Sequence, residues 1–506
     1  MTLRLHPLLA LAAGTALAGC NLAPTYVRPV GAVPTALPQG GVYPVAATDA
    51  PDITRVGWRD FFTDDRLRRV IALGLDNNRD LRLAAANVLQ ARANYRVQRS
   101  NLVPTTAASG SASYTNNFAG LGGAGAAGGS TGAGGGVGTG GGVGTGGGVG
   151  TGGAVGAGVG TTTSNIEIYS ATIGFSAFEL DLFGRLRNLS RAAQEAYFAS
   201  EEAQRSTRIS LIAEIATAWQ TLAADQDQLR LSRDTLKAFE QTLELTRAQF
   251  RIGVASELEA KQAETNYQAA RNDIATGLTR IAQDQNALNL LVGTTVTADL
   301  LPTGLGTADA ALATLPGNIA SDILLRRPDV LQAEHQLIAQ NANIGAARAA
   351  FFPRISLTAA VGTLSTALSG LFGSGSETFS ASPGVSLPLF DGGRNKGNLD
   401  YARASQQAAV ATYERTIQTA FREVADALAQ RGTIDEQVEA QTARADAAQT
   451  AARLSDARYR AGVDSFLVAL DAQRTAYGAQ QQLVTTRLAR GSNLVEVYRS
   501  LGGGLN

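Results

Sequence analysis

Residues 250–254 (FRIGV) and residues 459–463 (YRAGV) carry one motif that is written twice in the chain. In both copies a glycine follows a long stretch without proline and almost without glycine. The two glycines, Gly253 and Gly462, are 209 residues apart, and Arg185 and Arg394, which open the two stretches, have the same separation. Because a chance match would not keep this register, the sequence indicates an internal repeat of two similar halves.

Each stretch before the glycine is predicted to form one helix, over about 184–251 and about 394–460. At 1.5 Å per residue, such helices are roughly 100 Å long, beyond the range of globular domains and typical of a coiled-coil bundle. Apolar residues recur at spacings of three and four in the first of them, at Ile209, Ile212, Ala216, Trp219 and Leu222.

Shorter helices are expected on either side of the long ones. Two begin near Ser256 and Ser465, and two more stop before Pro104 and Pro353. Two half-length helices in series would then match one long helix in each half of the chain.

Four segments alternate with a period of two and are predicted to be strands, at 104–115, 167–178, 355–362 and 379–390. One apolar face and one small polar face suit a strand between lipid and a water-filled lumen. A soluble amphipathic hairpin packed on a core would show the same pattern. Four strands cannot close a membrane barrel, which starts at about eight, so strands in lipid would require several chains to share one barrel.

Composition excludes several classes of function. Lys+Arg and Asp+Glu both number 43, so the basic surplus of a nucleic-acid binder is absent. The chain has one cysteine and two histidines, His6 and His335, and lacks a Gly-x-Ser-x-Gly elbow. We therefore expect no catalytic site, no metal site and no cofactor.

The N-terminus has the features of a processing signal. Arg4 precedes an apolar run at 8–18 that is too short to span a bilayer. The run ends in residues 17–20 (LAGC), which resemble the lipobox of bacterial lipoproteins, in which Cys20 would carry the acyl chains. The alternative is an ordinary secretory leader with a chance cysteine. Asn21 favours the outer membrane by the same resemblance.

Five regions are predicted along the chain: a signal peptide (1–19), a lipid-anchored linker (20–63), a first repeat (64–292), an equatorial connector (293–321) and a second repeat (322–506). The glycine-rich segment 120–160 interrupts the first repeat between two strands. Its composition predicts a flexible surface loop, since it cannot bury enough apolar surface to offset chain entropy.

Several motifs together resemble one family: residues 58–62 (WRDFF), 77–81 (NNRDL), 325–329 (LRRPD), 388–393 (PLFDGG) and 459–463. They are similar to those of outer-membrane efflux lipoproteins of the TolC superfamily, in the branch that serves RND-type pumps. The resemblance implies a mainly α fold with a small β part. It also implies a lipid-anchored homotrimer in the outer membrane, with a shared 12-stranded barrel and a periplasmic helical tunnel.

The same resemblance implies a passive exit duct for drugs or other small compounds. Its partners would be a periplasmic membrane-fusion adaptor and, through it, an inner-membrane RND pump. A duct for type I protein secretion is the alternative with the same architecture. An enzyme and a purely structural coiled-coil lipoprotein are the competing classes without a channel.

Two groups of site residues follow from the resemblance. The turns, with Arg251, Gly253, Val254, Arg460, Gly462 and Val463, would be periplasmic tips where the adaptor docks, although a plain helix turn is the alternative. Asp471, three residues before Arg474 on one helix face, and Tyr459 would form a gate. For Asp471 and Arg474 the alternative is a solvated surface pair that contributes under about 1 kcal/mol.

Overall fold

The computed structural model describes residues 21–29, 31, 33–34, 36–43, 56–116, 165–306 and 321–503. Cys20, the leader 1–19 and the glycine-rich loop 120–160 lie outside the described residues. The chain divides into two compact units. A helical unit takes up to residue 102, 181–354 and from 387 onward, and a sheet unit takes 103–180 and 355–386.

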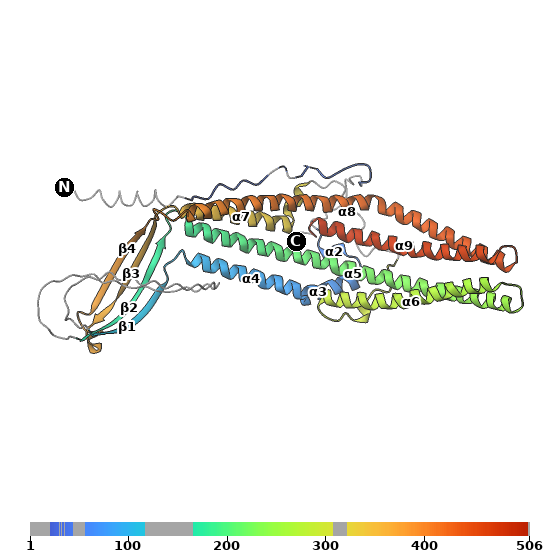
Figure 1. The fold of residues 1–506 in the computed structure, drawn as a ribbon, viewed down its shortest axis with the longest axis horizontal. Helices are drawn as coiled ribbons and strands as arrows, with labels where there is room; N and C mark the ends of the chain where they lie inside the picture. The colour runs from blue at the N-terminus through green and yellow to red at the C-terminus, as the bar shows by residue number, and fades with distance from the viewer. Residues whose placement is uncertain are drawn as a thin grey trace. The chain divides into compact units, whose positions relative to one another are not determined.

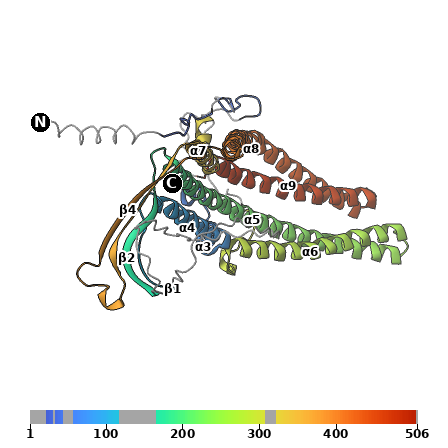
Figure 2. The same cartoon turned by 60° about the vertical axis from the view of Figure 1, so that its left-hand side comes forward.

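Two long helices dominate the helical unit, and both end at the predicted residue. They are α5 (Arg185–Arg251) and α8 (Arg394–Arg460), of 67 residues each. The returning helices α6 (Glu257–Val292) and α9 (Phe466–Ser500) lie beside α5 and α8 respectively and close two helical hairpins (Figures 1 and 2). Among the described residues, no helix is long and apolar enough to cross a membrane.

Shorter helices continue the two hairpins, as the repeat predicts. In Figure 1, α4 (Arg79–Ser100) and α6 follow one another along α5, and α7 (Pro328–Ala349) and α9 follow one another along α8. Helix α7 also packs on α5 and so joins the two halves of the repeat.

The hydrophobic core of the helical unit lies where α2 (Trp58–Phe61) and α3 (Asp65–Asn77) meet α5, α8 and α9. Phe61 stacks on Tyr498 near the C-terminus, with ring centroids 4.4 Å apart, and both side chains are buried. Burying an aromatic side chain of this size contributes roughly 2–3 kcal/mol. The motif at residues 58–62 is therefore a core element that packs against α9.

The sheet unit is one antiparallel sheet in the order β1-β2-β3-β4. Its strands are β1 (Thr106–Asn116), β2 (Asn165–Leu180), β3 (Arg354–Ser365) and β4 (Glu377–Ser386). The prediction that the last strand reaches residue 390 is wrong. Strand β4 ends at Ser386, two residues before Pro388, which has no N–H to donate to a ladder.

The register of the sheet places apolar residues opposite one another on neighbouring strands. Ile173 on β2 pairs with Ala108 on β1 and with Val361 on β3, and both Ile173 and Val361 are exposed. A bulge between Phe175 and Phe178 shifts the register, and Ala177 within it has a left-handed φ of 51°. The strict alternation of β2 therefore holds only up to Phe175.

Candidate functional site

The two predicted tip turns lie at the same end of the helical unit, and they have the same backbone geometry (Figures 1 and 2). Gly253 and Gly462 have φ values of 77° and 74°, in the left-handed region that glycine enters without strain. In each turn the following valine N–H donates a 2.9 Å hydrogen bond to a carbonyl five residues back, on Gln249 or Arg458. This is the bond pattern of a Schellman helix end, which explains why the sequence repeats a glycine here.

Both tips present apolar side chains to solvent. Val254 is 73% exposed and Val463 is 62% exposed. Ile252, Leu258 and Leu467 beside them are exposed to a similar degree. Apolar side chains gathered on a surface in this way are typical of an interaction site.

The charged residues at the tips differ between the two hairpins. Arg251 is exposed on the first tip, whereas Arg460 on the second pairs with Asp456 at 2.8 Å. Arg458 also clamps the second turn by donating from Nε and Nη2 to Asp464, at 2.6 and 2.9 Å. Hydrogen bonding to this guanidinium lowers the pKa of Asp464.

Tyr459 lies at the contact between the two hairpins. Its hydroxyl donates a 2.6 Å hydrogen bond to Oε1 of Gln249 in the last turn of α5. Its ring packs against Phe466, which belongs to a small buried cluster with Leu243, Ala263 and Leu470. Tyr459 therefore links α8 to α5, and its role in a gate stays a prediction.

Asp471 and Arg474 are exposed on α9. In the part of the chain that the structure describes, neither side chain forms a hydrogen bond or an ion pair, with the other or elsewhere. Their role in a gate therefore stays a prediction.

A second link between the hairpins was missed at the level of sequence. The hydroxyl of Tyr477 on α9 donates to Asp273 on α6 at 2.9 Å and lies 2.9 Å from Oγ of Ser232 on α5. Burial raises the pKa of Tyr477 to about 12, so it stays protonated and can donate. A tyrosine within a helix is an ordinary core residue by pattern, and no motif marks this position.

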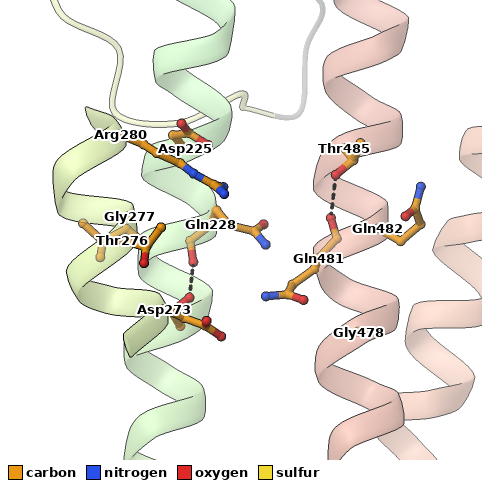
Figure 3. Close-up of a pocket in the computed structure, with 12 residues that line it drawn as sticks. Asp225, Gln228, Asp273, Thr276, Gly277, Arg280, Gly478, Gln481, Gln482 and Thr485 are labelled. Atoms are coloured by element: carbon orange, nitrogen blue, oxygen red, sulfur yellow. Dashed lines mark hydrogen bonds between the residues drawn. The ribbon is translucent and has the colours of Figure 1, made fainter. Parts of the chain in front are cut away.

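A polar cavity of about 400 Å³ opens beside Tyr477, between the α5–α6 hairpin and α9. Figure 3 shows Gln228 and Gln481 pointing toward one another across it, with Arg280 and Thr485 further along. Close by, burial and a hydrogen bond with Asp225 raise the pKa of Asp284 to about 6. Tyr459 and Tyr477 thus link the two hairpins by hydrogen bonds, in addition to the packing of α7 and α9 on α5, and a hydrophilic cavity opens between the hairpins beside Tyr477.

This architecture and these turns have known counterparts. The chain matches the model of the family described as outer membrane efflux protein over residues 70–294 and 319–503. The chain belongs to the outer membrane efflux protein family.

Relatives within the outer membrane efflux protein family match almost the whole chain. The probable efflux pump outer membrane protein TtgC of Pseudomonas putida is 43% identical over 490 residues, which cover 96% of this chain and 93% of TtgC. The outer membrane protein OprJ of Pseudomonas aeruginosa is 38% identical over 495 residues, covering 98% and 95%.

Solved structures of similar proteins share the fold. A membrane protein from Pseudomonas aeruginosa superposes with a TM-score of 0.81 at 37% identity, covering 96% of this chain and 98% of that chain. The open state of the outer membrane channel MtrE of Neisseria gonorrhoeae gives a TM-score of 0.79 at 33% identity, covering 96% and 99%. The mainly helical TolC-like fold with a small sheet is therefore confirmed.

Proposed function

We propose that this chain is the outer-membrane duct of a tripartite RND-type efflux pump, a channel protein and not an enzyme. The observation that carries the proposal is the pair of long hairpins with glycine tips, which are linked by hydrogen bonds of Tyr459 and Tyr477 and have a polar cavity between them. Relatives with this architecture are named as efflux pump proteins for toluene, solvents and antibiotics. These names favour efflux of small compounds over type I protein secretion.

We propose that three copies assemble, and that their sheets join into one barrel of twelve strands. The sheet of one chain supports this because β1 and β4 each have a neighbour on one side only. An unpaired strand edge leaves N–H and C=O groups without partners, which is costly in lipid.

Docking of a periplasmic adaptor, and through it of an RND pump, is proposed at the tips. The exposed Val254 and Val463 support this because they give both hairpins the same apolar end. The turns at Gly253 and Gly462 are open, since no atom would lie within 4 Å of an added Cβ at either position. A partner with a small apolar surface could therefore approach both turns closely.

A lipid anchor at Cys20, after removal of the signal peptide 1–19, is proposed from the path of the residues that follow it. Oδ1 of Asn21 accepts a 3.0 Å hydrogen bond from Asn188 at the start of α5, and the carbonyl of Leu22 accepts from Arg348 at the end of α7. The chain joins these two helix ends to β2 and β3. The described chain that follows Cys20 is therefore held at the helix ends from which the polypeptide continues into the strands, which supports an anchor on this segment.

The channel proposal is tested by conductance of the purified protein in planar bilayers. We expect a small, rarely open conductance for the wild type. It should become larger in the variant Tyr459→Phe with Tyr477→Phe, because the bonds between hairpins are lost. Asp471→Ala, measured in parallel, tests the predicted gate by the same criterion. If inserted trimers of the wild type and of both variants all lack conductance, the channel proposal is wrong and a purely structural coiled-coil lipoprotein is favoured instead.

Adaptor docking needs a separate measurement in cells of the source bacterium whose own copy is replaced. Val254→Asp with Val463→Asp should raise accumulation of a fluorescent efflux substrate while leaving bilayer conductance unchanged. Val27→Asp is the matched control, because Val27 is also exposed but lies on the N-terminal segment. Equal accumulation in the tip variant and in Val27→Asp would contradict docking at the tips, but it would not contradict the channel proposal.

A further inference from the structure

A second cavity lies far along the helical unit from the tips, between α2, α5 and α7. It has a volume of about 470 Å³ and lies beside the end of the described chain at Gly503. We call it the Trp58 cavity, and it is lined by Trp58, Glu202, Arg205, Arg208, Ile209, Ile212, Arg326, Pro328, Leu331 and Gly503. Its volume falls within the range of small-molecule sites, roughly 300–1,000 Å³.

The charges of the Trp58 cavity are unbalanced. Three arginines line it, at positions 205, 208 and 326, against one carboxyl group, Glu202. Arg205 pairs with Glu202 at 2.7 Å. Arg208 and Arg326 are exposed, and neither has a hydrogen-bond or ion-pair partner among the residues that the structure describes. Two guanidinium groups are therefore available, each with a planar fork of donors that fits a carboxylate or a phosphate.

Glu202 does little to oppose an anion in this cavity. The residue is buried, and Oε2 of its carboxyl group has no hydrogen-bond partner in the described structure. Burial raises the pKa of Glu202. Its carboxyl group is already paired with Arg205, so Arg208 and Arg326 face no further carboxyl group in the lining of the cavity.

The remainder of the lining is apolar. The side chains of Trp58, Ile209, Ile212 and Leu331 come from three different helices. Trp58 is 6% exposed, and the guanidinium of Arg59 covers its ring at 4.5 Å from the centroid. A small inorganic anion would not contact these apolar side chains, whereas a ligand with a hydrocarbon chain would.

We propose that the Trp58 cavity binds a single-chain amphiphile with an oxyanion head group. The head lies between Arg208 and Arg326, and the hydrocarbon chain lies on Trp58, Ile209 and Leu331. A fatty acid, through its carboxylate, and a lysophospholipid, through its phosphate, share this chemistry. The site lies apart from the hairpin tips and from the polar cavity between the hairpins, so it does not depend on the proposed channel function.

The test uses the fluorescence of Trp58 in full-length trimers held in nanodiscs of zwitterionic lipid. Trp219→Phe leaves Trp58 as the single tryptophan, because the chain has two. Three bromine-labelled probes are titrated: dodecanoate, dodecyl phosphate and the uncharged dodecanol. Bromine quenches tryptophan only at close range, so quenching reports occupancy of this cavity.

We expect saturable quenching by one or both anionic probes and weak, unsaturated quenching by dodecanol. Quenching by dodecanoate alone would identify a fatty-acid site, and quenching by dodecyl phosphate alone a phosphate site. In Arg208→Gln with Arg326→Gln, affinity should fall by about tenfold or more, as expected when charge-assisted hydrogen bonds are lost. Arg233→Gln is the matched control, since Arg233 is exposed on α5 but does not line the cavity.

Three results would overturn the proposal. They are no saturable quenching by either anion, equal quenching by dodecanol, and unchanged affinity in the double glutamine variant. Elution as a trimer shows whether that variant is folded. Raising the salt concentration gives a second readout on the unmodified arginines, because it should weaken binding of the anions and not of dodecanol.

Discussion

The hydroxyl of Tyr459 in the last turn of α8 donates a 2.6 Å hydrogen bond to Gln249 in the last turn of α5. The residue that corresponds to Tyr459 in the first repeat is Phe250, which has no hydroxyl and is partly exposed. The two halves of the repeat therefore have the same turns but not the same contacts. The hydrogen bond of Tyr459 from the second hairpin to the first therefore has no counterpart made by Phe250.

Removing this link should favour separation of the hairpins. For Tyr459→Phe we expect the ratio of open to closed channel to rise about fivefold, since a hydrogen bond of this kind contributes about 1 kcal/mol. Open probability in planar bilayers is the measurement. Tyr267→Phe is the control, because Tyr267 packs against the same buried cluster and its hydroxyl has no partner in the described structure. A similar rise in both variants would mean that loss of ring polarity, and not the bond, opens the channel.

The carboxyl of Asp284 should make stability depend on pH. Its pKa is raised from 3.8 to about 6, first by burial and then by the hydrogen bond with Asp225. A raised pKa means that the folded state holds the proton more tightly than the unfolded chain does. The contribution to stability is therefore complete below about pH 3.8 and is lost as the pH rises through about 6.

Asp284→Asn should consequently stabilise the protein at pH 7 by about 1 kcal/mol, a value reduced for solvent screening of a partly exposed group, and should have little effect at pH 4. The thermal unfolding midpoint at both pH values provides the check. Asp234→Asn is the control, because Asp234 is well exposed on α5. Equal shifts of the midpoint at both pH values would rule out titration of Asp284 as the cause.

The tip glycines should tolerate added volume but not the change in backbone preference. Gly253→Ala or Gly462→Ala should destabilise its turn by about 1 kcal/mol, because a left-handed φ is unfavourable for alanine. Hydrogen exchange of the turn amides should rise about fivefold. In contrast, Gly397→Ala should stabilise α8 by about 0.5–1 kcal/mol, since Gly397 is exposed within the helix and has free space around it.

The N-terminal segment should come away from the helices when its main ion pair is removed. Arg28 donates from Nε and Nη2 to the buried Glu334 at 2.8 and 2.7 Å, and Tyr26 donates to the same carboxylate. For Arg28→Gln we expect about tenfold faster hydrogen exchange over residues 22–29, as a charge-assisted hydrogen bond contributes about 1.5–3 kcal/mol. Arg191→Gln, beside the same segment, should leave exchange unchanged. Unchanged exchange in Arg28→Gln would show that the close packing of Ala23 on Gly345 holds the segment by itself.

The sequence was sufficient to predict the long helices and most strand positions. Proline-free stretches that end in a repeated glycine define α5 and α8, and period-two alternation locates β2 and β3. The contacts of Tyr477 with Ser232 and Asp273 could not be predicted, because they depend on how three helices are rotated about their axes. The path of residues 21–29 along α5 and α7 could not be predicted from the sequence either. An extended segment that is held by a few individual side-chain contacts has no periodic pattern of apolar residues.

The four-stranded sheet with one neighbour for β1 and one for β4 has a genetic consequence. If three copies close one barrel, each chain pairs through β1 with one neighbour and through β4 with the other. The barrel closes only when all three of these interfaces between chains form. A variant whose β1 edge is blocked, for example by a proline near Ser111, could still pair through β4 and enter mixed trimers. When such a subunit is made in equal amount to the wild type, only about one trimer in eight would be free of it. Loss of one edge should therefore behave as a dominant trait, whereas loss of the whole chain should be recessive.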